Sequence, residues 1–270
     1  MKVAISNIAW PAAEEPQAAA VLVAKGVQGL EVAPTAVWSS PTEEPMEAVR
    51  AYRDGWRARG VRIVACQSLL FGRPDLCLFT TDAARRQTLA YLSAIIQLAG
   101  ALGAEALVFG SPKNRQVRDT PPAVAWSLAV EFFRTLGDVA ARHQTCLCIE
   151  PNPPAYGCDF IRTAAEGREL VRQVDHPGFR LHLDAAALTL SGEDGARAIE
   201  ESFPWLRHFH ASEPQLGVVG SGVTDHARFA DRLRRLGYQH WVSVEMRSGW
   251  TQPSVRAVES ALQFALDAYH

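Results

Sequence analysis

Short apolar runs rich in β-branched residues alternate along the whole chain with longer segments in which apolar residues recur at helical spacing. The short runs predict eight strands, over residues 3–7, 29–34, 61–69, 106–111, 146–151, 180–185, 206–212 and 241–247. The longer segments predict eight helices, over residues 14–25, 45–59, 82–102, 121–143, 162–174, 194–203, 225–236 and 253–268. Strict alternation of strand and helix is typical of parallel strands joined by helical crossovers.

Residues at the ends of these segments support the predicted boundaries. Pro45 opens the second helix, Asp82 can cap the third, and Gly103 ends it. Eight unbroken units favour an α/β fold, a single (β/α)8 TIM barrel, over an open doubly wound sheet. A doubly wound sheet ordinarily carries a Gly-rich phosphate loop after its first strand, and here that turn reads NIAWP. No linker or shift in composition divides the chain, so we expect one domain over residues 1–270.

Composition and charge exclude several classes of protein. With 48% hydrophobic and 21% charged residues, a chain of 270 residues can bury a substantial core. The 27 basic and 29 acidic residues give a net charge of −2, which predicts neither a nucleic-acid partner nor a membrane surface. No apolar run approaches the roughly 18 residues that a membrane span needs.

The cysteines and the first residues bear on the cellular setting. The chain has five cysteines, an odd number without a CxxC pair, and its start lacks the apolar region and cleavage site of a signal peptide. We therefore expect a reducing, cytoplasmic location. The oligomeric state is left open, a homo-oligomer included.

One metal-capable side chain ends each of the last four predicted strands. Functional residues of a parallel barrel lie at the C-terminal ends of its strands, and these four strands end at Glu150, Asp184, His210 and Glu245. Strand alternation places them on the polar face, opposite apolar residues that would contact the helices. Burial of three carboxylates is costly unless they bind a cation. The sequence therefore predicts one divalent ion; the oxygen-rich set favours Mn²⁺, Mg²⁺ or Co²⁺, with Zn²⁺ left open.

Other polar residues near strand ends are candidates for substrate binding. Glu31 and Gln67 end the second and third strands and could bind sugar hydroxyls. Lys113 and Arg115 follow the fourth strand and could hold a phosphate or carboxylate, although solvated loop cations are an equally good interpretation.

Four more candidates lie close to the predicted ligands along the chain. Asn152 and Glu213 follow two of the ligands and could support them from behind. Arg247 follows Glu245 by two residues and could pair with it or with substrate. His226 opens the seventh helix after a glycine-rich loop and could reach the site, but a surface position is the simpler interpretation.

These residues resemble the xylose isomerase-like barrel family, which includes sugar isomerases, ketose 3-epimerases, inosose dehydratases and endonuclease IV. The resemblance covers essentially the whole chain, and the order Glu150, Asp184, His210, Glu245 matches the single metal site of the family. The segments that carry it are GLEVAP (29–34), FGSPKNR (109–115), IEPNP (149–153), HLD (182–184), FHASEP (209–214) and VEMR (244–247).

The resemblance implies a divalent-metal-dependent isomerase or epimerase of a sugar, sugar phosphate or cyclitol, working by proton transfer through a metal-stabilised enediolate. Glu150 and Glu245 would be ligands and the acid/base pair together. Two alternatives stay open: a metal-dependent dehydratase or lyase on an inosose-like substrate, and a barrel that binds metal and sugar without turnover.

The chain also departs from its proposed relatives. The 3-epimerases usually carry a substrate-binding histidine three positions after the metal Asp, where this chain has Ala187. This difference counts against a ketohexose 3-epimerase and leaves the metal site untouched. Endonuclease IV resembles the family but holds three zinc ions with many more histidines than this chain could supply, so DNA repair is not expected.

Overall fold

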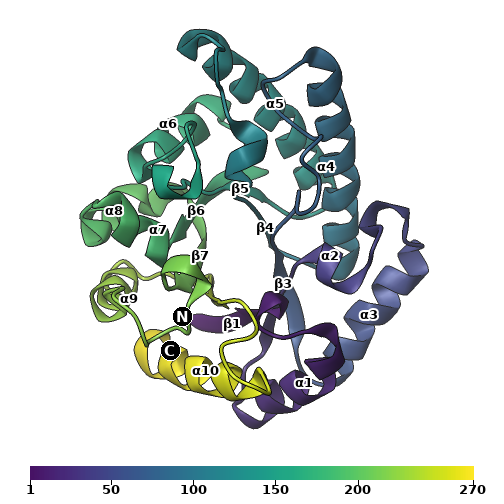
Figure 1. The fold of residues 1–270 in the computed structure, drawn as a ribbon, viewed down its shortest axis with the longest axis vertical. Helices are drawn as coiled ribbons and strands as arrows, with labels where there is room; N and C mark the ends of the chain where they lie inside the picture. Colours follow the sequence, from purple (N-terminus) through teal and green to yellow (C-terminus); the bar gives the residue numbers. More distant parts are fainter.

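The structure, a computed structural model, describes all of residues 1–270 and is a closed parallel barrel (Figure 1). The strands follow one another in chain order around the barrel, and the last pairs with the first, Val242 lying opposite Val3. This confirms the predicted fold class. The strands are β1 (Lys2–Ser6), β2 (Gly29–Val32), β3 (Arg62–Cys66), β4 (Ala106–Phe109), β5 (Leu147–Ile149), β6 (Phe179–Asp184), β7 (Leu206–Ser212) and β8 (Trp241–Glu245).

A ring of helices surrounds the barrel, as Figure 1 shows. None of them combines the length and the apolar character that crossing a membrane would require. The helices are α1 (Glu15–Ala24), α2 (Pro34–Val37), α3 (Met46–Ala58), α4 (Asp82–Leu102), α5 (Pro122–Arg142), α6 (Ala164–Val174), α7 (Ala185–Ser191), α8 (Gly195–Ser202), α9 (His226–Arg235) and α10 (Val255–Tyr269).

The eight predicted helices all form, with ends that differ by at most two residues from those expected. Two short helices, α2 and α7, were not predicted because each begins within two residues of a strand end and is too short to show periodicity. The N-cap of α4 is Thr81, whose Oγ1 accepts a hydrogen bond from the amide of Ala84 at 3.1 Å. The predicted cap, Asp82, is instead the first helical residue, where its charge faces the positive end of the helix.

The floor of the barrel is filled by small side chains and one indole. These residues lie on five strands or, for Cys146, directly before one, and they form a buried cluster of their own: Ala4, Val64, Ala65, Ala106, Cys146, Cys148 and Trp241. A β-carbon on Gly29 would lie 2.6 Å from the Trp241 ring and 2.7 Å from the Ala4 β-carbon, so only glycine fits beside this indole. The lumen is therefore packed at this end, as is usual for the fold.

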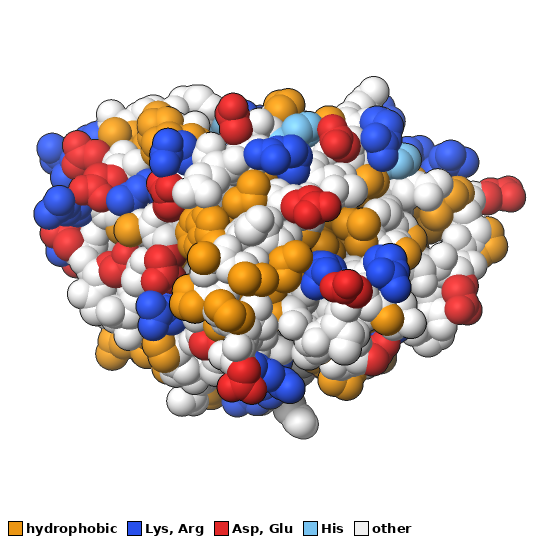
Figure 2. Space-filling view, turned by 90° about the horizontal axis from the view of Figure 1, so that it is seen from above, with side chains coloured by type: hydrophobic (Ala, Val, Ile, Leu, Met, Phe, Trp, Pro, Cys, Tyr) orange, Lys and Arg blue, Asp and Glu red, His pale blue; other side chains and the backbone are white.

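The outer surface carries charges of both signs. Figure 2 shows one face on which basic and acidic side chains are interspersed around a central group of hydrophobic ones. Many of the charges pair along or between helices, for example Arg168 with Glu201 at 2.8 Å and Arg232 with Glu200 at 2.9 Å. The near balance of charge in the composition is thus also present locally, as neighbouring pairs of opposite sign.

Candidate metal centre and active site

Four predicted ligands converge at the C-terminal mouth of the barrel. His210, fully buried on β7, places its Nδ1 3.3 Å from a Glu245 carboxylate oxygen. The same nitrogen lies 3.9 Å from a Glu150 oxygen and 3.9 Å from an Asp184 oxygen. Consecutive strands deliver these side chains to one height because their C-terminal ends form one rim (Figure 1).

The orientation of His210 is fixed from behind by Glu31 on β2. His210 Nε2 lies 3.0 and 3.1 Å from the two carboxylate oxygens of Glu31, so Nε2 carries a proton and Nδ1 faces the mouth. Burial alone would lower the pKa of His210, but the charges of Glu31 and Glu245 raise it well above its usual range, so an ion that binds Nδ1 displaces a proton from it. Burial would raise the pKa of Glu31, but the neighbouring charges of His210 and His208 outweigh it and hold that pKa well below its usual range. Glu31 is thus an ionised acceptor inside the barrel and has no exposed surface.

The residues present fit a divalent ion. His210 Nδ1 is buried and makes no hydrogen bond, and an ion bound there would be its missing partner. Burial, reinforced by the charges of Glu245 and Glu150, raises the pKa of Asp184 to about 7. Burial likewise raises the pKa of Glu245, against the opposing effect of His210. Both shifts come mainly from burial, and the charges of the neighbouring carboxylates add to them; a shared cation would favour the ionised forms against both effects.

Asp184 is held by the helix that directly follows it. It is the N-cap of α7, and its Oδ1 accepts a hydrogen bond from the amide of Ala187 at 2.6 Å. The hydroxyl of Ser212, on β7, donates to the other oxygen of Asp184 and accepts from the amide of Ala186 at 3.0 Å. Two elements therefore fix this carboxylate, as second neighbours of metal sites commonly do.

Two further histidines form a layer under the ligands. His182 and His208 are buried, and the His182 ring centroid lies 4.1 Å from that of His210. Burial lowers the pKa of His182 well below its usual range, and the nearby His210 and His208 add to the effect. His182 is therefore a neutral ring, and its Nε2 lies 3.4 Å from a Glu150 oxygen.

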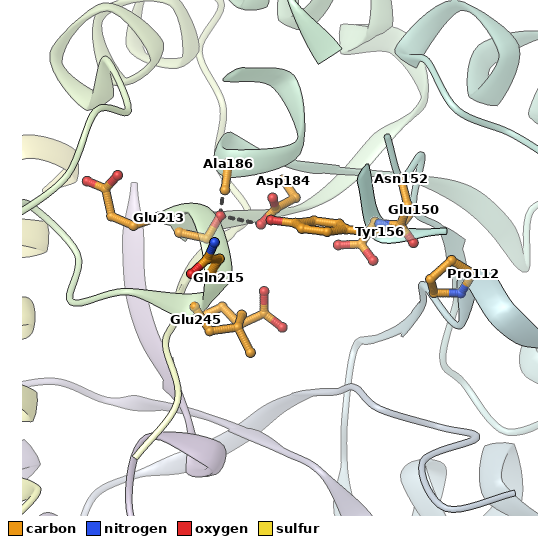
Figure 3. A pocket seen from close by; sticks show the side chains of 11 residues that line it. Pro112, Glu150, Asn152, Tyr156, Asp184, Ala186, Glu213, Gln215 and Glu245 are labelled. Carbon is orange, nitrogen blue, oxygen red and sulfur yellow. Dashed lines mark hydrogen bonds between the residues drawn. The ribbon is translucent and has the colours of Figure 1, made fainter. Parts of the chain in front are cut away.

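Above this layer opens a pocket of about 350 Å³, which is large enough for a small ligand. Figure 3 shows the carboxylates of Glu150, Asp184 and Glu245 directed into it from three sides. Five predicted site residues line the pocket: Glu150, Asn152, Asp184, Glu213 and Glu245. Six others complete the wall: Pro112, Tyr156, Ala186, Ser212, Gln215 and Leu216.

Tyr156, Gln215 and Leu216 were missed by the sequence reasoning, which considered only polar residues next to strand ends. Tyr156 ends a short 3₁₀ helix, η5 (Pro154–Tyr156), and burial raises the pKa of its phenol to about 12, with Asp184 the next contributor. Gln215 and Leu216 lie on η7 (Pro214–Leu216) with φ of 60° and 57°. Left-handed backbone at two successive non-glycine residues is strained and occurs preferentially at functional sites.

The Leu216 carbonyl is fixed by the loop that follows β8. It accepts hydrogen bonds from the amide of Arg247 at 3.1 Å and from the indole nitrogen of Trp250 at 2.8 Å. These two bonds hold the strained turn in place at the rim. No such long-range constraint can be read from the sequence.

Arg115 lies inside the protein and not in the pocket. Its guanidinium is fully buried and donates to the backbone carbonyl of Glu150 at 2.7 Å and to the side chain of Asn152 at 3.2 Å. It therefore shapes the β5–α6 loop. Lys113, two residues earlier, is exposed and does not line the pocket.

Glu213 lines the pocket, but its carboxylate turns away from the other carboxylates (Figure 3) and forms a buried pair with His226. Glu213 accepts hydrogen bonds from the amides of Gly222, Val223 and Thr224, at 3.1 to 3.2 Å. His226 Nε2 lies 3.3 Å from a Glu213 oxygen, and its Nδ1 lies 2.7 Å from the hydroxyl of Tyr269. The expectation of a surface position for His226 is wrong, because the ring packs under the β7–α9 loop and is 2% exposed.

The remaining predicted residues lie to the side of the pocket. Gln67 is buried, and its amide donates to Ser6 Oγ at 2.5 Å across the top of β1. Arg247 is exposed and lies over the Trp250 ring, 4.7 Å from its centroid, and not against Glu245. Thus Glu31, Gln67, Arg115 and His226 are buried supports, whereas Lys113 and Arg247 point to solvent.

Comparisons with known proteins agree with this geometry. A model of the family described as xylose isomerase-like TIM barrel matches residues 19–268. A probable ketose 3-epimerase from Synechocystis is 27% identical over 199 residues, which are 69% of this chain and 64% of that protein. A 3-dehydroshikimate dehydratase from Bacillus anthracis is 27% identical over 81 residues, 30% of this chain and 28% of that protein.

The matched segments span less than two thirds of the length of these curated relatives. Solved structures match over more of the chain. The crystal structure of a D-psicose 3-epimerase in the presence of D-fructose superposes with a TM-score of 0.81, covering 100% of this chain and 99% of that one. The two sequences are 20% identical, so this likeness concerns the fold.

Proposed function

Because the chain belongs to the xylose isomerase-like TIM barrel family, we propose that it is a divalent-metal-dependent isomerase or epimerase of a sugar or related polyol. One observation carries the proposal: three carboxylates and the unpartnered Nδ1 of His210 converge on one point at the mouth of the barrel. The relative named a ketose 3-epimerase supports it.

Glu150, Asp184, His210 and Glu245 would hold the ion. The oxygen-rich set with one imidazole suits Mn²⁺, Mg²⁺ or Co²⁺, and Zn²⁺ stays open. When bound, such an ion supplies a Lewis acid that polarises a carbonyl and an adjacent hydroxyl. Asp184 and His210 are 6% and 0% exposed, so they can hold an ion but offer a substrate little surface.

Glu150 and Glu245 are the two ligands that a substrate can touch. Their side chains are 12% and 15% exposed, and both face the pocket in Figure 3. One carboxylate can take the proton from the carbon next to a carbonyl, which leaves an enediolate. The other, initially protonated, can return a proton to the same carbon from the opposite face or to the neighbouring carbon. Exchange with solvent then restores the starting protonation of the pair.

Incorporation of deuterium tests this proposal. The Mn²⁺-loaded protein is incubated in deuterium oxide with a panel of ketoses and cyclitols, and the carbon-bound protons are followed by NMR. We expect exchange next to the carbonyl, and we expect Glu150→Gln or Glu245→Gln to lower its rate by roughly 10²–10⁴-fold, the usual contribution of acid/base catalysis. The matched control is Glu169→Gln on the surface of α6, which should leave the rate unchanged. Full activity in either pocket variant would refute the proton-transfer pair.

The same measurement separates the two alternatives. A dehydratase, suggested by the relative from Bacillus anthracis, would release water and give a product that lacks one hydroxyl. A barrel that binds sugar without turnover would show saturable binding and no exchange. The single domain over residues 1–270, the cytoplasmic location and a homo-oligomer stay predictions.

A further inference from the structure

The β7–α9 loop of this barrel contains a backbone site of the kind that binds anions. The amides of Gly222, Val223 and Thr224 point to one spot behind the rim of the pocket. Successive amides that converge in this way form a concave site for phosphate or carboxylate groups. In (β/α)8 barrels, phosphate groups are frequently bound by the loops after strands seven and eight.

In this protein the chain itself occupies that site. The Glu213 carboxylate accepts all three amide hydrogen bonds, at 3.1 to 3.2 Å, and lies 3.3 Å from His226 Nε2. Glu213 is 3% exposed, and a β-carbon on Gly222 would overlap one of its oxygens. An internal carboxylate that accepts three amide hydrogen bonds in a buried setting leaves no room for an external anion.

The pocket also lacks a cationic side chain with which an anion could pair. None of the lining residues is Lys, Arg or His. Arg115 is fully buried and does not line the pocket: its Nη2 donates to the oxygens of Glu150 and Asn152, and its Nε and Nη1, which have no partner, are closed off from solvent. Arg247 lies over Trp250. The first amides of α7, those of Ala186 and Ala187, are bonded to Ser212 and Asp184.

The rest of the pocket lining is uncharged and partly apolar. Tyr156, Leu216 and Pro112 present an aromatic ring, an aliphatic side chain and a pyrrolidine to the pocket. Asn152 and Gln215 add neutral amide groups at its edge. Such a wall fits the C–H face of a polyol and neutral hydrogen bonding, while three ligand carboxylates leave the pocket net negative even around a divalent ion.

We propose that this pocket selects an uncharged polyhydroxy ketone or cyclitol and rejects phosphorylated or carboxylated substrates, because Glu213 occupies the backbone anion site. The inference rests on the proposed function and narrows its substrate class. It also assigns Glu213 a role in specificity: an internal carboxylate in place of a substrate phosphate.

The first test compares a matched pair of substrates on the Mn²⁺-loaded protein. D-fructose and D-fructose 6-phosphate are followed by deuterium exchange next to the carbonyl. We expect kcat/KM for the neutral ketose to exceed that for its phosphate at least tenfold. Equal or faster exchange with the phosphate would overturn the inference and leave the proposed function standing. If the phosphate is preferred and Lys113→Met abolishes that preference, the exposed Lys113 is the phosphate ligand and the inference is wrong.

The second test works without turnover, so it remains decisive if neither sugar is a substrate and the proposed function fails. Thermal unfolding of the Mn²⁺-loaded protein is measured with and without inorganic phosphate. Direct phosphate binding to the ion would stabilise all three proteins equally, so the measured quantity is the difference between them. The amide of Glu213→Gln still fills the site, and we expect phosphate to stabilise this variant no more than the natural chain. Glu213→Ser vacates the site, and we expect phosphate to raise its unfolding temperature by more than that of the other two proteins. Equal stabilisation of the natural chain and a folded Glu213→Ser would refute the inference.

Discussion

The proton on His210 Nε2 determines what the opposite nitrogen can do. The fully buried Glu31 accepts the hydrogen bond from Nε2, which turns Nδ1 toward the mouth, where it can bind an ion after releasing its own proton. The sequence placed Glu31 at a strand end and suggested contact with sugar hydroxyls. Strand alternation gives the face of a residue but not the length of its reach, and here the side chain crosses the lumen to a histidine on β7.

Replacing Glu31 by Gln keeps its shape and removes its charge. His210 then donates to a neutral acceptor and becomes a weaker ligand, so we expect the affinity for Mn²⁺ to fall by roughly 10–100-fold. Calorimetric titration measures the change. The control is Glu169→Gln on α6, which lies far from the site. An unchanged affinity in Glu31→Gln would mean that the hydrogen bond does not tune the ligand.

At the scale of elements, β4 contributes no metal ligand, but the glycine that follows it leaves room for the side chain of Glu150. It ends next to Gly110, where a β-carbon would overlap an Oε atom of Glu150 on the neighbouring strand. The carboxylate is the movable end of its side chain, so a larger residue would displace it without disturbing the backbone. Gly110 therefore lets β5 place its ligand.

Gly110→Ala should separate metal binding from folding. We expect the metal-free protein to unfold at nearly the same temperature, and the stabilisation by Mn²⁺ to drop clearly because Glu150 is displaced. The comparison variant is Gly55→Ala in α3, where the nearest atom is 3.6 Å away. It should gain about 1 kcal/mol from helix propensity and keep its full response to Mn²⁺. A Gly110→Ala protein that responds to Mn²⁺ like the natural chain would contradict this role.

Elements also show where sequence reasoning succeeds and where it stops. The strands, the long helices and the four convergent residues could be predicted from apolar patterns with a period of 2 or 3.6 residues. These patterns are visible in the sequence because they reflect which side of each element is buried. Helix α7 was not visible: seven residues following Asp184 directly carry too little periodicity, so the cap that orients a predicted ligand was missed. Tyr156 and Leu216 lie on loops whose direction depends on distant hydrogen bonds, such as those to the Leu216 carbonyl.

At the scale of the whole molecule, protonation, metal binding and folding are linked. The pKa of Asp184 is raised from 3.8 to about 7 in the folded protein, mainly by burial. The folded state therefore holds this proton more tightly than the unfolded state. The resulting stability is present at low pH and is lost as the pH rises through about 7. An ion that binds the ionised carboxylate reverses the trend.

We expect the metal-free protein to unfold at a lower temperature at pH 8 than at pH 6, and Mn²⁺ to stabilise it more at pH 8. Calorimetry with a chelator measures the unfolding temperature of the metal-free protein at each pH, and calorimetry with excess Mn²⁺ measures the stabilisation by the ion. Asp184→Asn removes the titrating group and should flatten both dependences between pH 6 and pH 8. If the response to Mn²⁺ were equal at the two pH values, proton release from Asp184 would not accompany binding.

Because the N-terminal end of the lumen is packed around Trp241, the site opens to solvent only at the C-terminal mouth of the barrel. Whatever reaches the carboxylates arrives past Tyr156 and Leu216, and it departs by the same route. The product of the proposed reaction would therefore have to leave this pocket before the next substrate molecule can enter it. Product should therefore act as a purely competitive inhibitor, and the pace of a turnover cycle can be set by departure as much as by chemistry.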